Sequence, residues 1–212
     1  MRASIRTQVG KNERAETRPG LAKARRTGGD GNPEVFCADE QASVEVDLER
    51  WQALALDVLE AEGVRGAAEL TVVFVDEGTM QQLNAQYMGS NYATDVLAFP
   101  LDAVEVTRTP GPGALTKGPD KNEFDIADLP LLLGDVVICP TVAVKQAPLH
   151  AGTEDDEMAL LLVHGILHVL GNDHDTPEAA GAMQALERKH LESFHWHATA
   201  PANFRHVPEV KQ

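Results

Sequence analysis

Three stretches of the chain carry apolar residues three and four positions apart, the spacing that places them on one face of a helix. Each stretch begins at a residue type that caps helix N-termini, and the first two end at a glycine. These signals are Asp47 and Gly63, then Asp76 and Gly89, then Thr176 followed by Pro177. The pattern therefore predicts three helices, each with one face packed on a core.

Short apolar runs predict four strands between and around these helices. They are residues 43–46, 70–75, 95–101 and 134–139. Pro100 indicates that the third strand runs at an edge or stops there, because proline cannot donate to a ladder. Pro140 ends the fourth strand, and a short helix from Thr141 is interrupted by Pro148.

A fourth helical stretch differs from the others because it is apolar on nearly every side. It begins with Thr153 and an acidic first turn, and continues through Met158 to Leu170. Acidic residues in a first turn interact favourably with the helix dipole, and a helix without a polar face lies in a core. The sequence therefore predicts a central buried helix.

Composition sets the expected domain limits. Residues 1–34 are rich in Arg, Lys and Gly, and are predicted to be a disordered basic tail. Residues 35–197 are predicted to form one domain, within which residues 102–133, rich in Pro and Gly, form a long loop. Residues 198–212 are predicted to be a loose C-terminal tail.

Charge is distributed unevenly along the 212 residues, whose net charge is −15. Residues 1–30 carry eight Lys or Arg against three Asp or Glu, which leaves ten against thirty in the remainder. An acidic body is a poor general binder of nucleic acid. An RNA substrate would therefore need a local positive site, from a metal ion or from the basic tail.

Two further features indicate the compartment. No apolar run approaches the roughly 20 residues that span a bilayer, and no apolar stretch follows the basic N-terminus as in a secretory signal. Cys37 and Cys139 are the only cysteines and lie far apart in the sequence. A disulfide framework is not expected, and we predict a cytoplasmic protein without membrane contact.

Candidate chemistry gathers at the end of the buried helix, in His164-Gly165-Ile166-Leu167-His168-Val169-Leu170-Gly171-Asn172-Asp173-His174. His164 and His168 share a helical face, and Gly171 can end the helix and turn the chain so that His174 returns towards them. Three imidazoles with an open fourth direction are the usual ligand set of catalytic zinc. We therefore expect one Zn²⁺ per chain.

The spacing is that of the zinc-protease motif H-E-x-x-H-x-x-G-x-x-H with one departure. Gly165 occupies the position of the glutamate that takes a proton from zinc-bound water in those enzymes. The motif thus predicts a hydrolytic metal site and argues against ordinary peptide hydrolysis.

Three segments, in order, resemble the YbeY family of rRNA-maturation endoribonucleases over roughly residues 44–194. The first is Leu83-Asn84 leading into Thr94-Asp95-Val96-Leu97-Ala98-Phe99-Pro100, similar to the family's L-N…T-D-V-L-S-F-P. The second is Leu133-Gly134-Asp135-Val136-Val137-Ile138-Cys139, similar to L-G-D-I-V-I-C, and the third is the histidine motif.

The resemblance implies an α/β (α+β) fold, with a small mixed four-stranded sheet flanked by helices and a central His-bearing helix. It implies one Zn²⁺ held by His164, His168 and His174, and cleavage of single-stranded RNA. It also implies 3′ end maturation of small-subunit (16S) rRNA, ribosome quality control, and contact with the ribosome or its small subunit. Many family members carry an Arg where this chain has Met88, so a cationic contributor is missing at that position.

Two aspartates keep alternative interpretations. Asp95, with Thr94, lines the cleft beside the metal or forms the turn into a strand. Asp173 orients a ligand imidazole or caps its own turn. Both are candidate catalytic residues, because a proton from the nucleophile could go to Asp173, to Asp95 or to bulk water. The other histidines are not expected to be ligands: His150, His190, His195, His197 and His206.

Two other classes of function remain open. The same histidine spacing allows a zinc metalloprotease-like hydrolase. A non-catalytic ribosome-assembly factor with structural zinc is the second alternative, although structural sites are usually closed by four protein ligands. The sequence does not decide whether the nucleophile is a hydroxide or the 2′-hydroxyl of the substrate. It does not decide the oligomeric state either.

Overall fold

The computed structural model describes residues 22–27, 32–101 and 130–206. The elements are β1 (Ala22–Thr27), β2 (Glu34–Asp39), α1 (Leu48–Ala61), β3 (Ala68–Phe74), α2 (Glu77–Tyr87), β4 (Val96–Pro100), β5 (Leu131–Ile138), α3 (Pro140–Gln146), the 3₁₀ turn η2 (Ala147–Leu149), α4 (Glu154–Val169), α5 (Pro177–His190) and the π-helical turn η3 (Leu191–His195). Within these ranges no helix is long and apolar enough to cross a bilayer.

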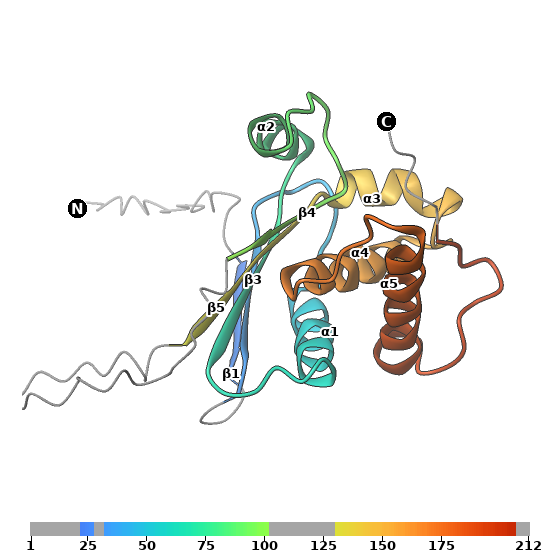
Figure 1. Ribbon diagram of the computed structural model, residues 1–212. Helices are drawn as coiled ribbons and strands as arrows, with labels where there is room; N and C mark the ends of the chain where they lie inside the picture. Colours follow the sequence, from blue (N-terminus) through green and yellow to red (C-terminus); the bar gives the residue numbers. More distant parts are fainter. Residues whose placement is uncertain (1–21, 28–31, 102–129, 207–212) are drawn as a thin grey trace, which may run out of the picture.

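The strands form one mixed sheet in the order β1-β2-β3-β5-β4 (Figure 1). β2 and β5 both run parallel to β3, whereas the two outer strands, β1 and β4, run antiparallel to their neighbours. The predicted α/β fold with a mixed sheet is confirmed. The sheet has five strands rather than four, and Pro100 ends its edge strand β4 as predicted.

The predicted strand at residues 43–46 is wrong. Those residues lie in the connection between β2 and α1, where the side chain of Gln41 accepts from the backbone of Ser43 and Val44 and donates to the carbonyl of Val44. This side chain satisfies the backbone groups that a neighbouring strand would otherwise bind. The strands at this end are instead β2, where Val35 and Cys37 are buried, and β1, inside the predicted tail.

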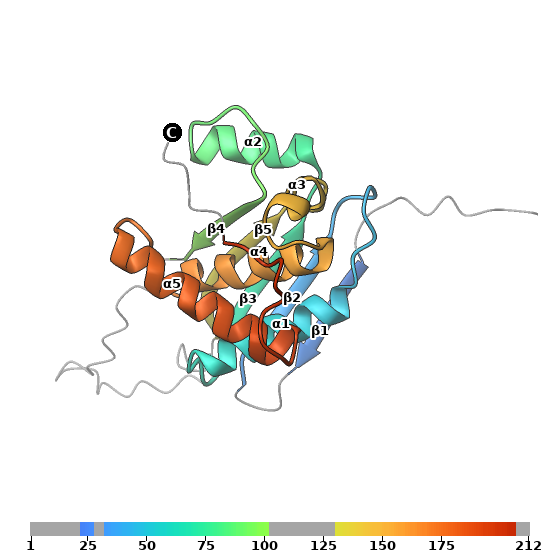
Figure 2. The same cartoon turned by 90° about the vertical axis from the view of Figure 1, so that its right-hand side faces the viewer.

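Helices α1 and α4 cover one face of the sheet, and α5 packs on α4 on the side away from the strands (Figure 1). Figure 2 looks onto these helices, with α4 running across the strands and α5 crossing α4. Twelve of the sixteen residues of α4 are buried. The prediction of a central buried helix is therefore confirmed. The predicted caps are also confirmed, since Asp47, Asp76, Thr153 and Thr176 each accept a backbone N–H from the first turn.

Helix α2 packs against the opposite face. Val136 and Ile138 point to the main core beneath α4, whereas Val137 belongs to a second cluster with Met80 of α2 and Leu97 of β4. Successive residues of a strand point to opposite faces, so the second cluster lies on the far side of the sheet. β5 is therefore covered on both faces, which makes it a rigid support for α4.

Two predicted irregular segments are shorter than expected. β5 begins at Leu131, so the end of the predicted loop at 102–133 belongs to the sheet, and residues 102–129 lie outside the described ranges. At the C-terminus, Phe204 is only 7% exposed and its ring packs edge-on against Trp196. The segment up to His206 is therefore folded against the domain and is not a loose tail.

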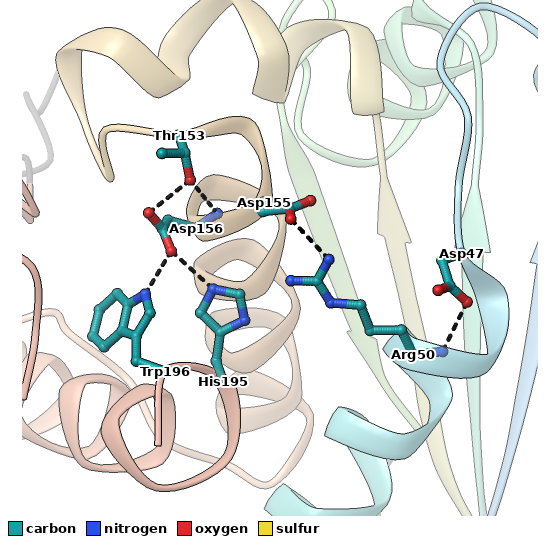
Figure 3. A network of polar contacts seen from close by, with 7 residues as sticks. All are labelled: Asp47, Arg50, Thr153, Asp155, Asp156, His195 and Trp196. Atoms are coloured by element: carbon teal, nitrogen blue, oxygen red, sulfur yellow. Dashed lines mark hydrogen bonds and ion pairs between the residues drawn. The ribbon is translucent and has the colours of Figure 1, made fainter. Parts of the chain in front are cut away.

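A polar network fixes the N-terminus of α4 to the segment that follows α5 (Figure 3). The carboxylate of Asp156 accepts hydrogen bonds from Thr153 Oγ1 at 2.6 Å, from His195 Nε2 at 2.8 Å and from Trp196 Nε1. Burial alone would raise the pKa of Asp156, but these hydrogen bonds outweigh it and the pKa is lowered. The network connects the start of the histidine-bearing helix to the C-terminal segment.

Replacing Asp156 with alanine is expected to lower the free energy of unfolding by about 2–4 kcal/mol, because it leaves the buried donors of Trp196 and His195 without an acceptor. Chemical denaturation of both proteins measures the difference.

Asp155→Ala is the matched control from the same helical turn. Its carboxylate binds Arg50 (Figure 3), at a distance of 2.8 Å. The side chain of Asp155 is 64% exposed, and surface ion pairs contribute about 1 kcal/mol or less. Equal losses in the two variants would show that the network does not stabilise the fold.

Candidate metal centre

The end of α4 is built by a glycine turn. Gly171 has φ +88°, and its N–H donates to the carbonyl of His168 while the N–H of Asn172 donates to that of Leu167. This is the Schellman arrangement, which only glycine adopts without strain. It reverses the chain directly after the helix and returns His174 to the end of α4, as the sequence predicts.

Three histidines converge at this turn. The Nε2 atom of His168 lies 3.1 Å from Nε2 of His164 and 3.0 Å from Nε2 of His174. Ligand nitrogens bound at about 2 Å to a tetrahedral Zn²⁺ lie about 3.3 Å apart, so the spacing fits one ion. Within the described part of the chain, these three histidines form the group of side chains that could hold a metal ion.

The protonation of the central imidazole also suits a metal ligand. Burial, together with the neighbouring charges of His164 and His174, lowers the pKa of His168 to about 4. A hydrogen bond to the backbone of Asn172 holds its ring in place. At neutral pH His168 is therefore uncharged, which is the form that binds a cation.

A carboxylate that the sequence analysis did not identify orients the first ligand. Glu187 of α5 accepts a hydrogen bond from Nδ1 of His164 at 2.7 Å, which leaves Nε2 free for a metal. Burial alone would raise the pKa of Glu187, but its contacts with His164 and His206 lower it to about 2. Carboxylates of this kind fix the tautomer and direction of a metal-binding histidine.

Gly165, between the first two histidines, faces the sheet and not the metal. A Cβ at this position would lie 2.5 Å from Cγ1 of Val136 and 3.4 Å from Cγ2 of Val96. The helix approaches β4 and β5 this closely only because residue 165 lacks a side chain. The space that a glutamate side chain would need at residue 165 is therefore occupied by Val136 and Val96 of the sheet.

Neither predicted aspartate binds a ligand imidazole in the described contacts. Asp173 is exposed, and its Oδ1 accepts the backbone N–H of His174 at 2.7 Å, the turn-capping alternative. Asp95 accepts from the N–H of Val96 and the hydroxyl of Thr94, as expected for a turn into a strand. Its charge adds to the burial that raises the pKa of Glu157.

The remaining histidines have partners away from the three ligand nitrogens. His150 contacts Glu157, His190 contacts Glu62, His195 contacts Asp156, His197 contacts the carbonyl of Ser193, and His206 contacts Glu187. None belongs to the group that could hold an ion in the described residues. Met88, at the C-cap of α2, is 54% exposed.

Comparison with known proteins gives a consistent set of similarities. The model of the family described as Endoribonuclease YbeY matches residues 36–195. The chain is 42% identical over 159 residues to the Endoribonuclease YbeY of Salinispora tropica, covering 75% of this chain and 94% of that protein. It is also 42% identical over 152 residues to the one of Acidothermus cellulolyticus, covering 71% and 85%.

Among solved structures, the solution structure of TM1509 from Thermotoga maritima superposes with a TM-score of 0.44 at 20% identity. The match covers 77% of this chain and 93% of that chain.

Proposed function

The chain belongs to the YbeY endoribonuclease family, and from this premise and the histidine site we propose that it is a metal-dependent endoribonuclease acting on single-stranded RNA. The observation that carries the proposal is the convergence of three imidazole nitrogens with no fourth protein ligand among the described residues. Such a site holds an ion and leaves one position for substrate or water.

We propose that the ion is Zn²⁺, one per chain, held by His164, His168 and His174. Three nitrogen ligands in near-tetrahedral spacing suit zinc better than the oxygen-binding cations. When bound, the ion would supply Lewis-acid polarisation of the scissile phosphodiester.

Two groups of the chain are candidates to receive the nucleophile's proton. Asp173 is the stronger one, because its carboxylate is exposed, lies next to His174 and acts electrostatically on His168. Asp95 is the weaker one, because its described hydrogen bonds serve the start of β4. Gly165 offers no side chain for this role.

Binding of RNA has to overcome the net charge of −15. Cations in the folded body are partly neutralised, since Arg50 pairs with Asp155 and Lys145 with Glu77. Met88 adds no charge where many family members have Arg. We propose that the metal ion and the basic residues of the first thirty positions supply the attraction for phosphate.

The finer biological role follows from the family. We propose that the substrate is the 3′ region of small-subunit (16S) rRNA, that the partner is the ribosome or its small subunit, and that the protein contributes to ribosome quality control. The cytoplasm is the proposed compartment, which agrees with the two buried cysteines, Cys37 and Cys139, being free thiols.

The two alternative functions are less well supported. A metalloprotease needs a carboxylate one residue after His164, and Gly165 instead packs on Val136. An assembly factor with structural zinc needs a closed site, and the described residues supply three ligands.

The full-length protein, purified without added metal, tests the proposal. We expect about one zinc per chain by elemental analysis, as three histidine ligands require. We also expect cleavage of a single-stranded RNA oligonucleotide that stops with a chelator and returns with zinc, and no cleavage of the same RNA in a duplex or of casein.

The alternatives predict different results. Cleavage of casein that depends on zinc would identify a protease. Bound zinc without any RNA cleavage, on the oligonucleotide or on an extended 16S 3′ fragment, would identify a structural metal. Zinc content below about half an ion per chain would contradict the metal assignment itself.

A further inference from the structure

The segment after η3 folds back over the loop that precedes α4. The backbone N–H of Arg205 donates to the carbonyl of His150 at 3.2 Å. Nearby, Gly152 has φ +101°, and a Cβ there would lie 2.1 Å from Nδ2 of Asn203. The two chain segments are therefore packed closely, and the position of residues 203–206 is defined by contacts on the domain.

Phe204 anchors this segment. Its ring is 4.8 Å from that of Trp196 at an interplanar angle of 76°, and the Arg188 guanidinium lies 5.7 Å from its centroid. The ring of His206 also packs edge-on against Phe204, at 4.8 Å and 84°. A buried aromatic ring thus fixes the direction of the His206 side chain.

His206 reaches the carboxylate that orients the metal ligand. Its Nε2 lies 3.0 Å from Oε2 of Glu187, while Oε1 of the same carboxylate binds His164 at 2.7 Å. The side chain of Glu187 is 4% exposed and that of His206 is 12% exposed. The His206 nitrogen lies off the direction of a linear hydrogen bond, so its contact with the carboxylate is electrostatic.

This contact lies outside the region that the family model matches, which ends at residue 195. His206 therefore lies outside the part of the chain that the family model matches. Its partner Glu187 lies within the matched region, on α5.

We propose that His206 is a positioning residue of the metal centre: it holds Glu187 so that the carboxylate keeps His164 aimed at the ion. The inference rests on the proposed metal function. A glutamate has several rotatable bonds, and a carboxylate held through one oxygen can turn about it. Contacts on both oxygens remove that freedom, and ligand sites need such support to keep their geometry.

The test measures metal binding directly. Zinc affinity is determined by competition with a chromophoric chelator, and ligand geometry is followed by the visible spectrum of the Co²⁺-substituted protein. Glu187→Gln is expected to weaken zinc binding by about tenfold or more, as is usual for partners of metal-binding histidines. His206→Ala is expected to weaken it by about threefold to tenfold and to shift the Co²⁺ spectrum.

Two further variants separate positioning from general support of the fold. His206→Gln keeps an N–H dipole that can approach Oε2 of Glu187 and is expected to recover part of the lost affinity, whereas a role in packing alone would leave it as weak as His206→Ala. His197→Asn is the matched control, because His197 is exposed, bonds only the carbonyl of Ser193 in the described contacts, and has a positive φ that Asn tolerates. It is expected to bind zinc as the wild type does.

A double-mutant cycle decides whether His206 acts through Glu187. In a Glu187→Gln background, His206→Ala is expected to change zinc affinity by less than about twofold. An equal loss in both backgrounds, or a loss below about twofold in the wild-type background, overturns the proposal while leaving the metal site intact. A wild-type protein that binds no zinc would overturn the metal function and this inference together.

Discussion

A His168→Ala protein is expected to lose its metal ion and, with it, RNA cleavage. His168 is the central ligand, within 3.1 Å of both other ligand nitrogens. Structural zinc sites bind with about 10–16 kcal/mol from four ligands, so removal of one ligand should cost about 3 kcal/mol, or roughly a hundredfold in affinity. Loss of the ion should reduce the cleavage rate by at least about a thousandfold.

Elemental analysis and a single-stranded RNA cleavage assay measure the two effects. His197→Asn serves as the control, since it alters an exposed histidine that belongs to neither the metal site nor Glu187. A His168→Ala protein that retained zinc with wild-type affinity would show that the three histidines are not the ligands. Retained zinc-dependent cleavage would contradict their catalytic role.

Gly165→Glu is expected to destabilise the fold severely and to give no peptide cleavage. The new Cβ would meet Val136, whose branched side chain is stiff, at 2.5 Å. Overpacking of this kind costs about 1–3 kcal/mol, and an unpaired carboxylate buried against the sheet costs several more. The better helix propensity of Glu returns only about 0.5–1 kcal/mol. The net loss is comparable to the whole stability of a typical domain.

Gly181 provides the matched control, because it lies in α5 with no atom within 4 Å of its Cβ position. Gly181→Glu should be neutral or slightly stabilising in thermal denaturation. Gly165→Ala introduces the close contact without the charge and should lie between the two. A Gly165→Glu protein as stable as the wild type, and active on peptides, would contradict both the packing and the choice of RNA as substrate.

The parts of the fold that depend on local chemistry could be predicted from the sequence. The caps at Asp47, Asp76, Thr153 and Thr176 are side-chain contacts within one turn. The positive φ of Gly171 follows from the residue type itself, because glycine adopts this conformation without strain. The three histidines are likewise brought together by one helix and one turn. Each of these features needs only a few consecutive residues, so the pattern is sufficient.

The parts that depend on distant partners could not be predicted. β1 is a strand because it pairs with β2, although the basic composition around it is typical of a tail. Glu187 lies on the inner face of its helix, four residues after Met183 and three before His190. A charged residue on a buried helical face needs a partner, so this position could have been identified from the sequence as a candidate for the site. Its partner His164 is twenty-three residues away, so the pairing itself required the structure.

The order of the strands has a consequence for how the protein folds. β5 is the last strand along the chain but lies between β3 and β4 in the sheet. Leu70 of β3 therefore pairs with Gly134 of β5, although α2, β4 and residues 102–129 separate them in the sequence. Closing so long a loop is slow because its entropy is lost before the contacts form. Helix α4 packs on β4 and β5, so the helix that carries His164 and His168 is held in place only once these strands have paired. The nuclease site is therefore expected to form late in folding, so a partly folded chain would not cleave RNA.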